Sequence, residues 1–269
     1  MCPSAAVGTI ICVKGVRAVD MTFVFRRRES KYFLTEGKYR RLMSDIADML
    51  EPDVYGLSTV CSIYLDTPDF GLARRSAEAV DYKEKLRIRS YGEGAEPASD
   101  VFFEIKKKYG GIVYKRREIM TLSDAEQYLG TGVPPRASQI MREIDYAMKF
   151  YRPEPAAAVS YEREAFTAKN DPGLRLTFDT GVRYRTDRLS LAAGSAGKYL
   201  LPVGTVLLEV KSPGGMPLWL TGALDGNGIF PSSFSKYGAA YRQMIGAAGK
   251  IGEITDNSMK GLPVPGRNG

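Results

Sequence analysis

Apolar and polar positions alternate along much of this chain, with the period of two that is typical of β-strands. The clearest example runs from Val101 to Met120, where two alternating segments flank the pair Gly110-Gly111. This arrangement predicts a β-hairpin with a two-residue turn. The segment Tyr82–Tyr91 alternates in the same way and predicts a further strand.

Cations gather on one face of the predicted hairpin. The turn sets a register in which that face holds Glu104, Lys106, Lys108, Lys115 and Arg117. Lys106 then lies opposite Lys115, and Glu104 lies opposite Arg117. Like charges directly opposite each other destabilise a hairpin, so this face requires either open water or a bound anion.

The strand at 82–91 repeats this one-sided charge. One of its faces carries Lys83, Lys85, Arg87 and Arg89, and the other carries Glu84, Leu86, Ile88 and Ser90. A single cationic face is as often a solvated surface as a binding site. Two such faces in succession favour a sheet that curls around a polyanion site.

The remaining periodicities complete the predicted fold. Further strands are predicted at Phe23–Leu34, Thr59–Asp66, Ala158–Ala168, Leu174–Asp179, Val182–Leu189 and Thr205–Lys211. Helices are predicted at Glu36–Leu50, Phe70–Ala79, Asp124–Leu129, Ser138–Tyr151, Pro217–Leu224 and Ser235–Ile245. We therefore expect a single domain over 23–248, a disordered or mis-called N-terminal extension at 1–22 and a flexible C-terminal tail at 249–269.

Several other predicted strands carry two polar residues on one face, two or four positions apart. The pairs are Glu29 with Lys31, Tyr161 with Arg163, Arg175 with Asp179, and Glu209 with Lys211. Any one pair is more often a surface ion pair than part of a site. Their recurrence in nearly every strand favours a shared polar interior.

Composition narrows the chemistry. The 269 residues include 38 Lys and Arg against 31 Asp and Glu, and the net charge of +7 favours an anionic partner. The sequence contains no histidine, which excludes His-based zinc sites and Ser-His-Asp systems and leaves carboxylates, Lys, Arg, Tyr and a hard metal ion. Cys2, Cys12 and Cys61 form neither a disulfide framework nor a metal spacing, which favours a reducing, cytoplasmic location. No apolar run reaches the roughly 18 residues that cross a membrane.

Seven short motifs follow one another in an order typical of one family. They are Glu29-Ser-Lys31-Tyr-Phe, Arg87-Ile-Arg89-Ser-Tyr-Gly92, Phe103-Glu104-Ile-Lys106, Tyr161-Glu-Arg163-Glu-Ala-Phe166, Arg175-Leu-Thr-Phe-Asp179-Thr, Leu208-Glu209-Val-Lys211 and Phe234-Ser235-Lys236-Tyr237. Together they resemble the polyphosphate polymerase domain of the vacuolar transporter chaperone (VTC) proteins. That domain belongs to the triphosphate tunnel metalloenzymes, the CYTH-like superfamily, and the resemblance covers about Phe23 to Ile245.

This resemblance implies an α+β fold, an antiparallel β tunnel that forms a closed or nearly closed barrel with peripheral helices. It implies that a triphosphate is gripped by Lys31, Arg87, Arg89, Lys106, Arg163, Arg175 and Lys236, assisted by Tyr161 and Ser235. It also implies that Glu209 holds Mn²⁺ or Mg²⁺. The shared strand faces add Lys85, Lys115, Arg117 and Lys211 as substrate contacts, and Glu29 and Glu104 as further metal ligands.

Three functions are compatible with these residues. The favoured hypothesis is metal-dependent phosphoryl transfer from ATP to polyphosphate, in which positioning and cationic stabilisation supply most of the catalysis. The second is hydrolysis of inorganic triphosphate or a nucleoside triphosphate by the same scaffold. The third is a non-enzymatic module that binds polyphosphate or RNA. Glu29, Glu104 and Glu209 argue against the third, and against nucleic acid in particular, because a pure polyanion binder gains nothing from carboxylates.

Overall fold

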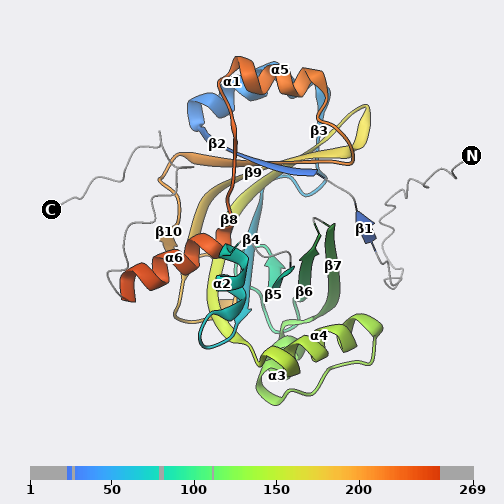
Figure 1. Cartoon of the computed structure of the whole chain (residues 1–269), viewed down its shortest axis with the longest axis vertical. Helices are drawn as coiled ribbons and strands as arrows, with labels where there is room; N and C mark the ends of the chain where they lie inside the picture. The colour runs from blue at the N-terminus through green and yellow to red at the C-terminus, as the bar shows by residue number, and fades with distance from the viewer. Residues whose placement is uncertain (1–22, 26–27, 79–81, 111, 249–269) are drawn as a thin grey trace, which may run out of the picture.

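The computed structural model describes residues 23–25, 28–78, 82–110 and 112–248, and it arranges them as one curled antiparallel sheet with helices around it (Figure 1). The predicted α+β fold with a nearly closed β tunnel and peripheral helices is confirmed. The predicted N-terminal extension and C-terminal tail lie outside the described residues.

The sheet and helices have the following bounds. The strands are β1 (Phe23–Phe25), β2 (Arg28–Thr35), β3 (Leu50–Pro52), β4 (Ser58–Asp66), β5 (Tyr82–Tyr91), β6 (Asp100–Tyr109), β7 (Ile112–Thr121), β8 (Glu154–Ala168), β9 (Asp171–Arg185), β10 (Lys198–Tyr199), β11 (Thr205–Ser212) and β12 (Pro231–Ser232). The helices are α1 (Glu36–Ile46), α2 (Gly71–Ala77), α3 (Leu122–Thr131), α4 (Gln139–Tyr151), α5 (Leu218–Gly226) and α6 (Lys236–Ala248), with 3₁₀ turns η1 (Ala47–Met49) and η2 (Leu191–Ala193).

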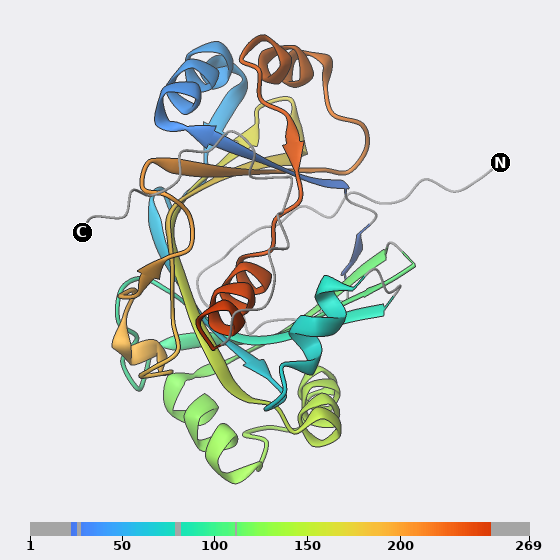
Figure 2. The ribbon, with the colours of Figure 1, turned by 60° about the vertical axis from the view of Figure 1, so that its left-hand side comes forward.

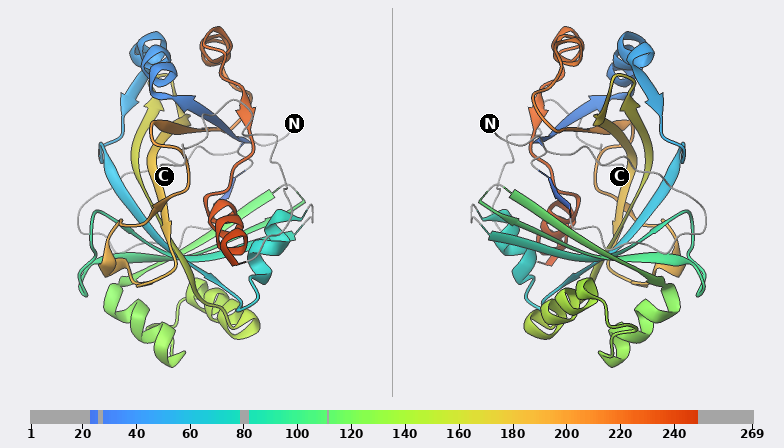
Figure 3. Two further views of the ribbon diagram at one scale, coloured as in Figure 1. Left: turned by 90° about the vertical axis from the view of Figure 1, so that its left-hand side faces the viewer. Right: turned by 90° about the vertical axis from the view of Figure 1, so that its right-hand side faces the viewer.

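The strand order explains why the sheet curls. Neighbouring strands follow the order β1-β7-β6-β5-β4-β8-β9-β11-β2-β12, while β10 pairs with β9 and β3 pairs with β8. β1 and β2 are adjacent in sequence but lie near opposite ends of this order, so the two ends of the sheet have to meet. An ion pair between Lys106 Nζ on β6 and Glu29 Oε2 on β2, at 3.8 Å, spans the two ends. Figures 2 and 3 show the resulting ring of strands.

Helices cover the outside of the ring in two places. The outer face of β4–β6, with Leu86, Ile88 and Phe103, packs with α3 and α4, and the outer face of β2, β9 and β11 packs with α1 and α5. Side-chain caps mark several helix starts, as at Thr35, which accepts a hydrogen bond from the Lys38 amide at 3.3 Å. α6 lies at one mouth of the ring (Figure 2), and its Tyr237 belongs to a buried cluster with inward-facing apolar residues of β4, β8 and β11. The apolar residues around Tyr237 fill one part of the interior, and the inner strand faces outside this cluster carry the polar side chains.

The predicted hairpin has the register expected from its turn. Lys106 pairs with Lys115 and Glu104 with Arg117, and Gly110 has the positive φ of 53° that such a turn requires. The alternating faces of the two strands are therefore the predicted ones.

Four predicted elements differ from the structure by more than a few residues at their ends. The single strand predicted at Phe23–Leu34 is two strands, because β1 pairs with β7 whereas β2 pairs with β11. The helix predicted at Glu36–Leu50 ends at Ile46, since the following residues form η1 and then pair with β8. The two strands predicted from Leu174 to Leu189 are one long strand, β9, with a register shift around Gly181, whose φ is 57°.

Candidate functional site

The cation row of β5 points into the tunnel. Arg87 donates from Nε to Glu104 Oε2 at 2.6 Å, and Arg89 donates from Nε to Ser62 Oγ at 3.0 Å. Arg89 also donates from Nη2 to the Tyr161 hydroxyl at 3.1 Å, and its residue surface is only 5% exposed. Alternation sends the residues between them outward into the core under α3 and α4, so this strand holds its cations inside by the same pattern that buries its apolar side.

Glu104 is the centre of the wall formed by β5, β6 and β7. Its carboxylate is 1% exposed and lies within 2.6 Å of Lys115 Nζ and 2.7 Å of Arg117 Nη2, in addition to Arg87. Burial opposes its ionisation, but Arg87, Lys115 and the neighbouring arginines hold the pKa of Glu104 well below its usual range. One buried carboxylate thus keeps three cations together on neighbouring strands.

Lys85 connects this wall to the helix at the tunnel mouth. Its Nζ donates to Ser235 Oγ at 2.9 Å, and Ser235 Oγ in turn accepts the Gly238 amide of α6 at 3.1 Å. Burial and the nearby cations Lys106, Lys31 and Arg87 lower the pKa of Lys85 to about 8, against the opposing effect of Tyr64. Lys85 is therefore held by a hydroxyl group and not by a carboxylate.

The opposite wall, formed by β2 and β11, carries two carboxylates. Glu209 is 8% exposed and accepts Lys211 Nζ at 2.7 Å, while Glu29 accepts Lys31 Nζ at 2.5 Å. Burial and repulsion by Glu209 act to raise the pKa of Glu29. The attraction of Lys106 and Lys31 is stronger, so the net result is a lowered pKa. Burial also opposes ionisation of Glu209, yet Lys211 and other lysines lower its pKa. Both groups are ionised and close to each other.

A third buried carboxylate, Asp179 on β9, binds two cations. Arg163 donates to both of its oxygens, at 2.6 and 2.8 Å, and Lys236 of α6 donates to Oδ2. Burial raises the pKa of Asp179, but Lys236 and Arg163 outweigh it and hold the value below its usual range. The Tyr161 ring lies below both cations, with Lys236 Nζ 4.3 Å and Arg163 Cζ 5.1 Å from its centroid.

The tunnel thus brings together most of the residues predicted from sequence, and two stand apart. Arg175 shares the strand face of Asp179, but it is ion-paired with Asp53 at 2.6 Å and its side chain is 44% exposed. Glu104 lies on the wall opposite Glu209 and Glu29, with its oxygens bound to cations. Accordingly, no group of three acidic or sulfur side chains suited to a metal ion occurs in the described part of the chain.

Two inward-facing residues of β4 were missed in the sequence. Tyr64 accepts a hydrogen bond from Arg87 Nη1 at 3.2 Å, and Ser62 accepts one from Arg89. The signal was present, because Ser62, Tyr64 and Asp66 are the polar positions of an alternating strand. Their role depends on the cation row of a neighbouring strand, which alternation alone does not identify.

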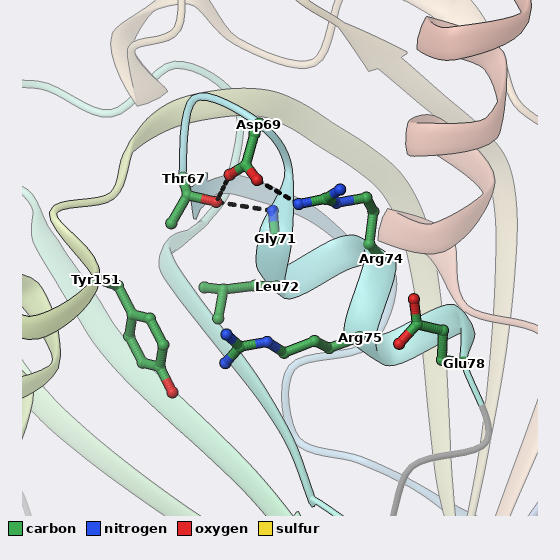
Figure 4. A pocket seen from close by; sticks show the side chains of 8 residues that line it. All are labelled: Thr67, Asp69, Gly71, Leu72, Arg74, Arg75, Glu78 and Tyr151. Atoms are coloured by element: carbon green, nitrogen blue, oxygen red, sulfur yellow. Dashed lines mark hydrogen bonds and ion pairs between the residues drawn. The ribbon is translucent and has the colours of Figure 1, made fainter.

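A separate cavity of about 300 Å³ lies between α2 and the end of α4 (Figure 4). Its polar groups bind one another: Arg74 pairs with Asp69, whose carboxylate also accepts from the Thr67 hydroxyl at 2.6 Å. Arg75 lies over the Tyr151 ring, 6.0 Å from its centroid. None of the tunnel residues described above lines this cavity, so the tunnel is the candidate site.

A curled antiparallel sheet with cations and carboxylates on its inner face is the architecture that the family resemblance implied. The sequence profile of the VTC domain matches residues 26–245, which is most of the chain, and the chain belongs to this family. The resemblance identified from the seven motifs is thereby confirmed. No curated protein matches the sequence.

Three solved structures are similar to this chain at low sequence identity. A candidate adenylate cyclase from Bacillus halodurans has a TM-score of 0.50 and 13% identity, covering 80% of this chain and 95% of its own. A candidate adenylate cyclase from Vibrio parahaemolyticus has a TM-score of 0.43 and 10% identity, covering 81% and 99%. The PH1819 protein from Pyrococcus horikoshii has a TM-score of 0.43 and 11% identity, covering 82% and 99%. The first of these supports the fold assignment.

Among the described residues, no helix has both the length and the apolar character needed to cross a bilayer.

Proposed function

We propose that this protein is a metal-dependent phosphotransferase that extends polyphosphate from ATP. The observation that carries the proposal is the convergence of cations from β5, β6 and β7 inside one tunnel. Among the described residues of that wall, only Glu104 neutralises them. Lys85 and Arg89 make hydrogen bonds to hydroxyl groups instead of carboxylates. A triphosphate would supply the negative charge that these side chains lack.

The predicted phosphate contacts fall into two groups. Those of the first wall, where cations outnumber the single carboxylate Glu104, are Lys85, Arg87, Arg89, Lys106, Lys115 and Arg117. Those of the second wall, which would exchange a carboxylate for a phosphate oxygen, are Lys31, Arg163, Lys211 and Lys236, with Tyr161 and Ser235 beside them. Arg175 is ion-paired with Asp53 and partly exposed, apart from the other cations. We keep it as a proposed contact only for a ligand long enough to reach it.

Glu209 and Glu29 are the residues that would hold Mn²⁺ or Mg²⁺. Both ions prefer oxygen ligands, and these two carboxylates are ionised and close to each other on neighbouring strands. Two protein ligands suit an ion whose remaining positions are taken by water and substrate phosphates. Glu104 fits this role less well because Arg87, Lys115 and Arg117 occupy its oxygens. When bound, the ion would neutralise charge on the phosphate oxygens.

The transfer itself needs no protein nucleophile. An oxygen of the terminal phosphate of the chain attacks the γ-phosphorus of ATP, and the bond from that phosphorus to the β-bridging oxygen breaks, releasing ADP. The arginines would stabilise the charge on the peripheral oxygens of the transferred group. The proposal therefore asks the protein for positioning and electrostatics, which are what the tunnel residues supply.

Hydrolysis of a triphosphate is the second candidate. It is favoured by one observation, the closeness of Glu29 and Glu209, since a carboxylate near a bound γ-phosphate could orient a water molecule. Both reactions use the same cations and differ only in the acceptor. The cytoplasmic location stays a prediction from cysteine usage.

The test is incubation with ATP and Mn²⁺, followed by gel analysis for polyphosphate and assays for ADP and free phosphate. We expect one ADP for each phosphate added to polyphosphate, with little free phosphate. Free phosphate without polymer would support the hydrolase, and binding of polyphosphate without turnover would support the non-enzymatic module. Lys106→Ala should reduce either activity, whereas Lys107→Ala should not, because Lys107 lies on the opposite face of β6 and pairs with Glu84 at 3.3 Å.

A further inference from the structure

The tyrosine of β4, Tyr64, lies among the cations of β5. Strand pairing sets it opposite Arg87, and its hydroxyl accepts from Arg87 Nη1 at 3.2 Å. Its residue surface is 6% exposed, and the Arg87 guanidinium carbon lies 5.9 Å from its ring centroid. Among the hydrogen bonds between described residues, the Tyr64 hydroxyl accepts one and donates none. The donor is therefore unused inside a tunnel built for anions.

A second phenol provides an internal comparison. The rings of Tyr64 and Tyr237 stack in parallel, with centroids 4.5 Å apart and an angle of 3° between planes. The Tyr237 hydroxyl donates to Asp66 Oδ2 at 2.6 Å, and Asp66 also accepts the amides of Leu72 and Ala73 at the start of α2. Tyr237 is thus committed to a structural bond, while its stacked neighbour is not.

The charges around the two hydroxyls differ in sign. Burial and Asp66 raise the pKa of Tyr237 above its usual value. Burial acts in the same direction on Tyr64, but Arg87, Arg89 and Lys85 outweigh it and lower the pKa of Tyr64 to about 8. The groups that face Tyr64 are Lys85, Arg87 and Arg89 on β5, Lys31 on β2, Tyr161 on β8 and Tyr237 on α6.

We propose that Tyr64 is a phosphate ligand whose ionisation competes with the substrate: Tyr64 can ionise in the empty tunnel, and a bound triphosphate holds it as the phenol. As a phenolate, Tyr64 partly neutralises the cations of β5. As a phenol, it can donate its free proton to a phosphate oxygen. Above about pH 8, where the phenolate predominates in the empty tunnel, binding of a triphosphate therefore takes up a proton at the Tyr64 oxygen. This inference rests on the proposed triphosphate site and names a residue and a linkage within it.

The direction of the pH effect follows from this competition. Below about pH 7 the phenol predominates, so Tyr64 adds no pH dependence to binding. At about pH 9 only about a tenth of the empty protein holds the phenol, so the contribution of Tyr64 to affinity falls roughly ten-fold. Lys85 loses its proton in the same range, so the affinity of the wild type alone does not isolate Tyr64.

The first experiment follows phenolate absorbance in the near ultraviolet, to which lysines contribute nothing. In the protein without ligand, one tyrosine should ionise at about pH 8, and inorganic tripolyphosphate should move that step upward by more than one pH unit. The step should vanish in Tyr64→Phe. It should persist in Tyr91→Phe, the matched control, because Arg89 and Arg117 also lower the pKa of Tyr91 against the effect of burial.

The second experiment measures tripolyphosphate affinity by calorimetry at both ends of the range. Both proteins carry Lys85→Met, because the pKa of Lys85 depends on Tyr64 and its titration would not cancel in the ratio of the dissociation constants of Tyr64→Phe and Tyr64. We expect a ratio of about ten near pH 7 that falls toward one near pH 9. A ratio that is constant with pH, or an early phenolate step that ignores tripolyphosphate, would overturn the inference and leave the proposed function intact. Absence of tripolyphosphate binding by the wild type at every pH would overturn both, so the two failures are distinguishable.

Discussion

The two walls of the tunnel solve the problem of buried charge differently. In the wall of β5, β6 and β7, Glu104 is shared by Arg87, Lys115 and Arg117, while Lys85 and Arg89 contact hydroxyls. In the wall of β2, β9 and β11, Glu29 and Glu209 each pair with a lysine of the same strand, and Asp179 binds Arg163 and Lys236. The first wall carries an excess of positive charge and the second is close to balance. The difference separates an anion-binding surface from a surface that could hold a cation.

The largest expected effect is the loss of stability on replacing Glu104. Glu104→Gln removes the carboxylate shared by three cations and should destabilise the protein by about 3–5 kcal/mol in urea unfolding. Glu143→Gln, which removes a partly exposed ion pair with Arg116, should cost about 1 kcal/mol or less. Tripolyphosphate should restore more stability to Glu104→Gln than it adds to the wild type, because it replaces the missing charge. Wild-type stability of the variant would mean that Glu104 does not organise this wall.

The second wall is tested at Glu209. Glu209→Gln keeps the shape of the side chain and removes a proposed metal ligand, so turnover should fall at least about 100-fold, or about 2.7 kcal/mol. Tripolyphosphate affinity, measured by calorimetry without metal, should change less than about three-fold, since the cations of the first wall remain. If turnover persists, Glu209 does not hold the metal.

Binding and fold are separated by two neighbouring lysines of β6. Lys106→Ala removes a half-exposed cation from the inner face and should weaken tripolyphosphate binding by about 1.5–3 kcal/mol. It should leave the melting temperature without ligand unchanged or higher, because it relieves repulsion between cations. Lys107→Ala on the outer face should leave the affinity unchanged. Equal losses of affinity in the two variants would contradict the assignment of faces.

The last prediction is a pH dependence of stability. The pKa of Lys85 is lowered to about 8 in the folded protein and is about 10 in the unfolded chain, so the unfolded state binds more protons between these values. Stability without ligand should therefore rise with pH in this window, and Tyr64 and Lys115, whose pKa is lowered to about 7, act in the same direction. Lys85→Met should flatten the rise in thermal melts at pH 8 to 10, and a rise of unchanged size would exclude Lys85 as its source.

The sequence predicted which side chains share a strand face better than it predicted which strands pair. Alternation in Tyr82–Tyr91 and across the hairpin correctly predicted which cations share a surface, and the Gly110 turn predicted their register. Strand pairing between distant segments was not predictable in this way. The division of Phe23–Leu34 into β1 and β2, and the short strands β3 and β12, depend on partners far along the chain.

The same limit applies to the site. Face alternation correctly placed Glu104 and Arg175 but did not reveal their neighbours. Glu104 is surrounded by cations because three strands converge on it, and Arg175 is drawn to Asp53 because the segment after β3 passes beside it. Tyr64 was overlooked because its importance comes from Arg87 on the next strand.

Among the described residues, the two ends of the sheet meet without strand pairing between them. At one end, β1 has three residues and pairs with β7 only from Phe23 to Phe25, whereas β8 and β9 each have 15 residues. Local opening costs least where the fewest contacts are lost, so we expect β1 to detach from β7 while the rest of the sheet stays folded. If polyphosphate is the substrate, as proposed, such an opening would let a long chain enter the tunnel from the side as well as by its end.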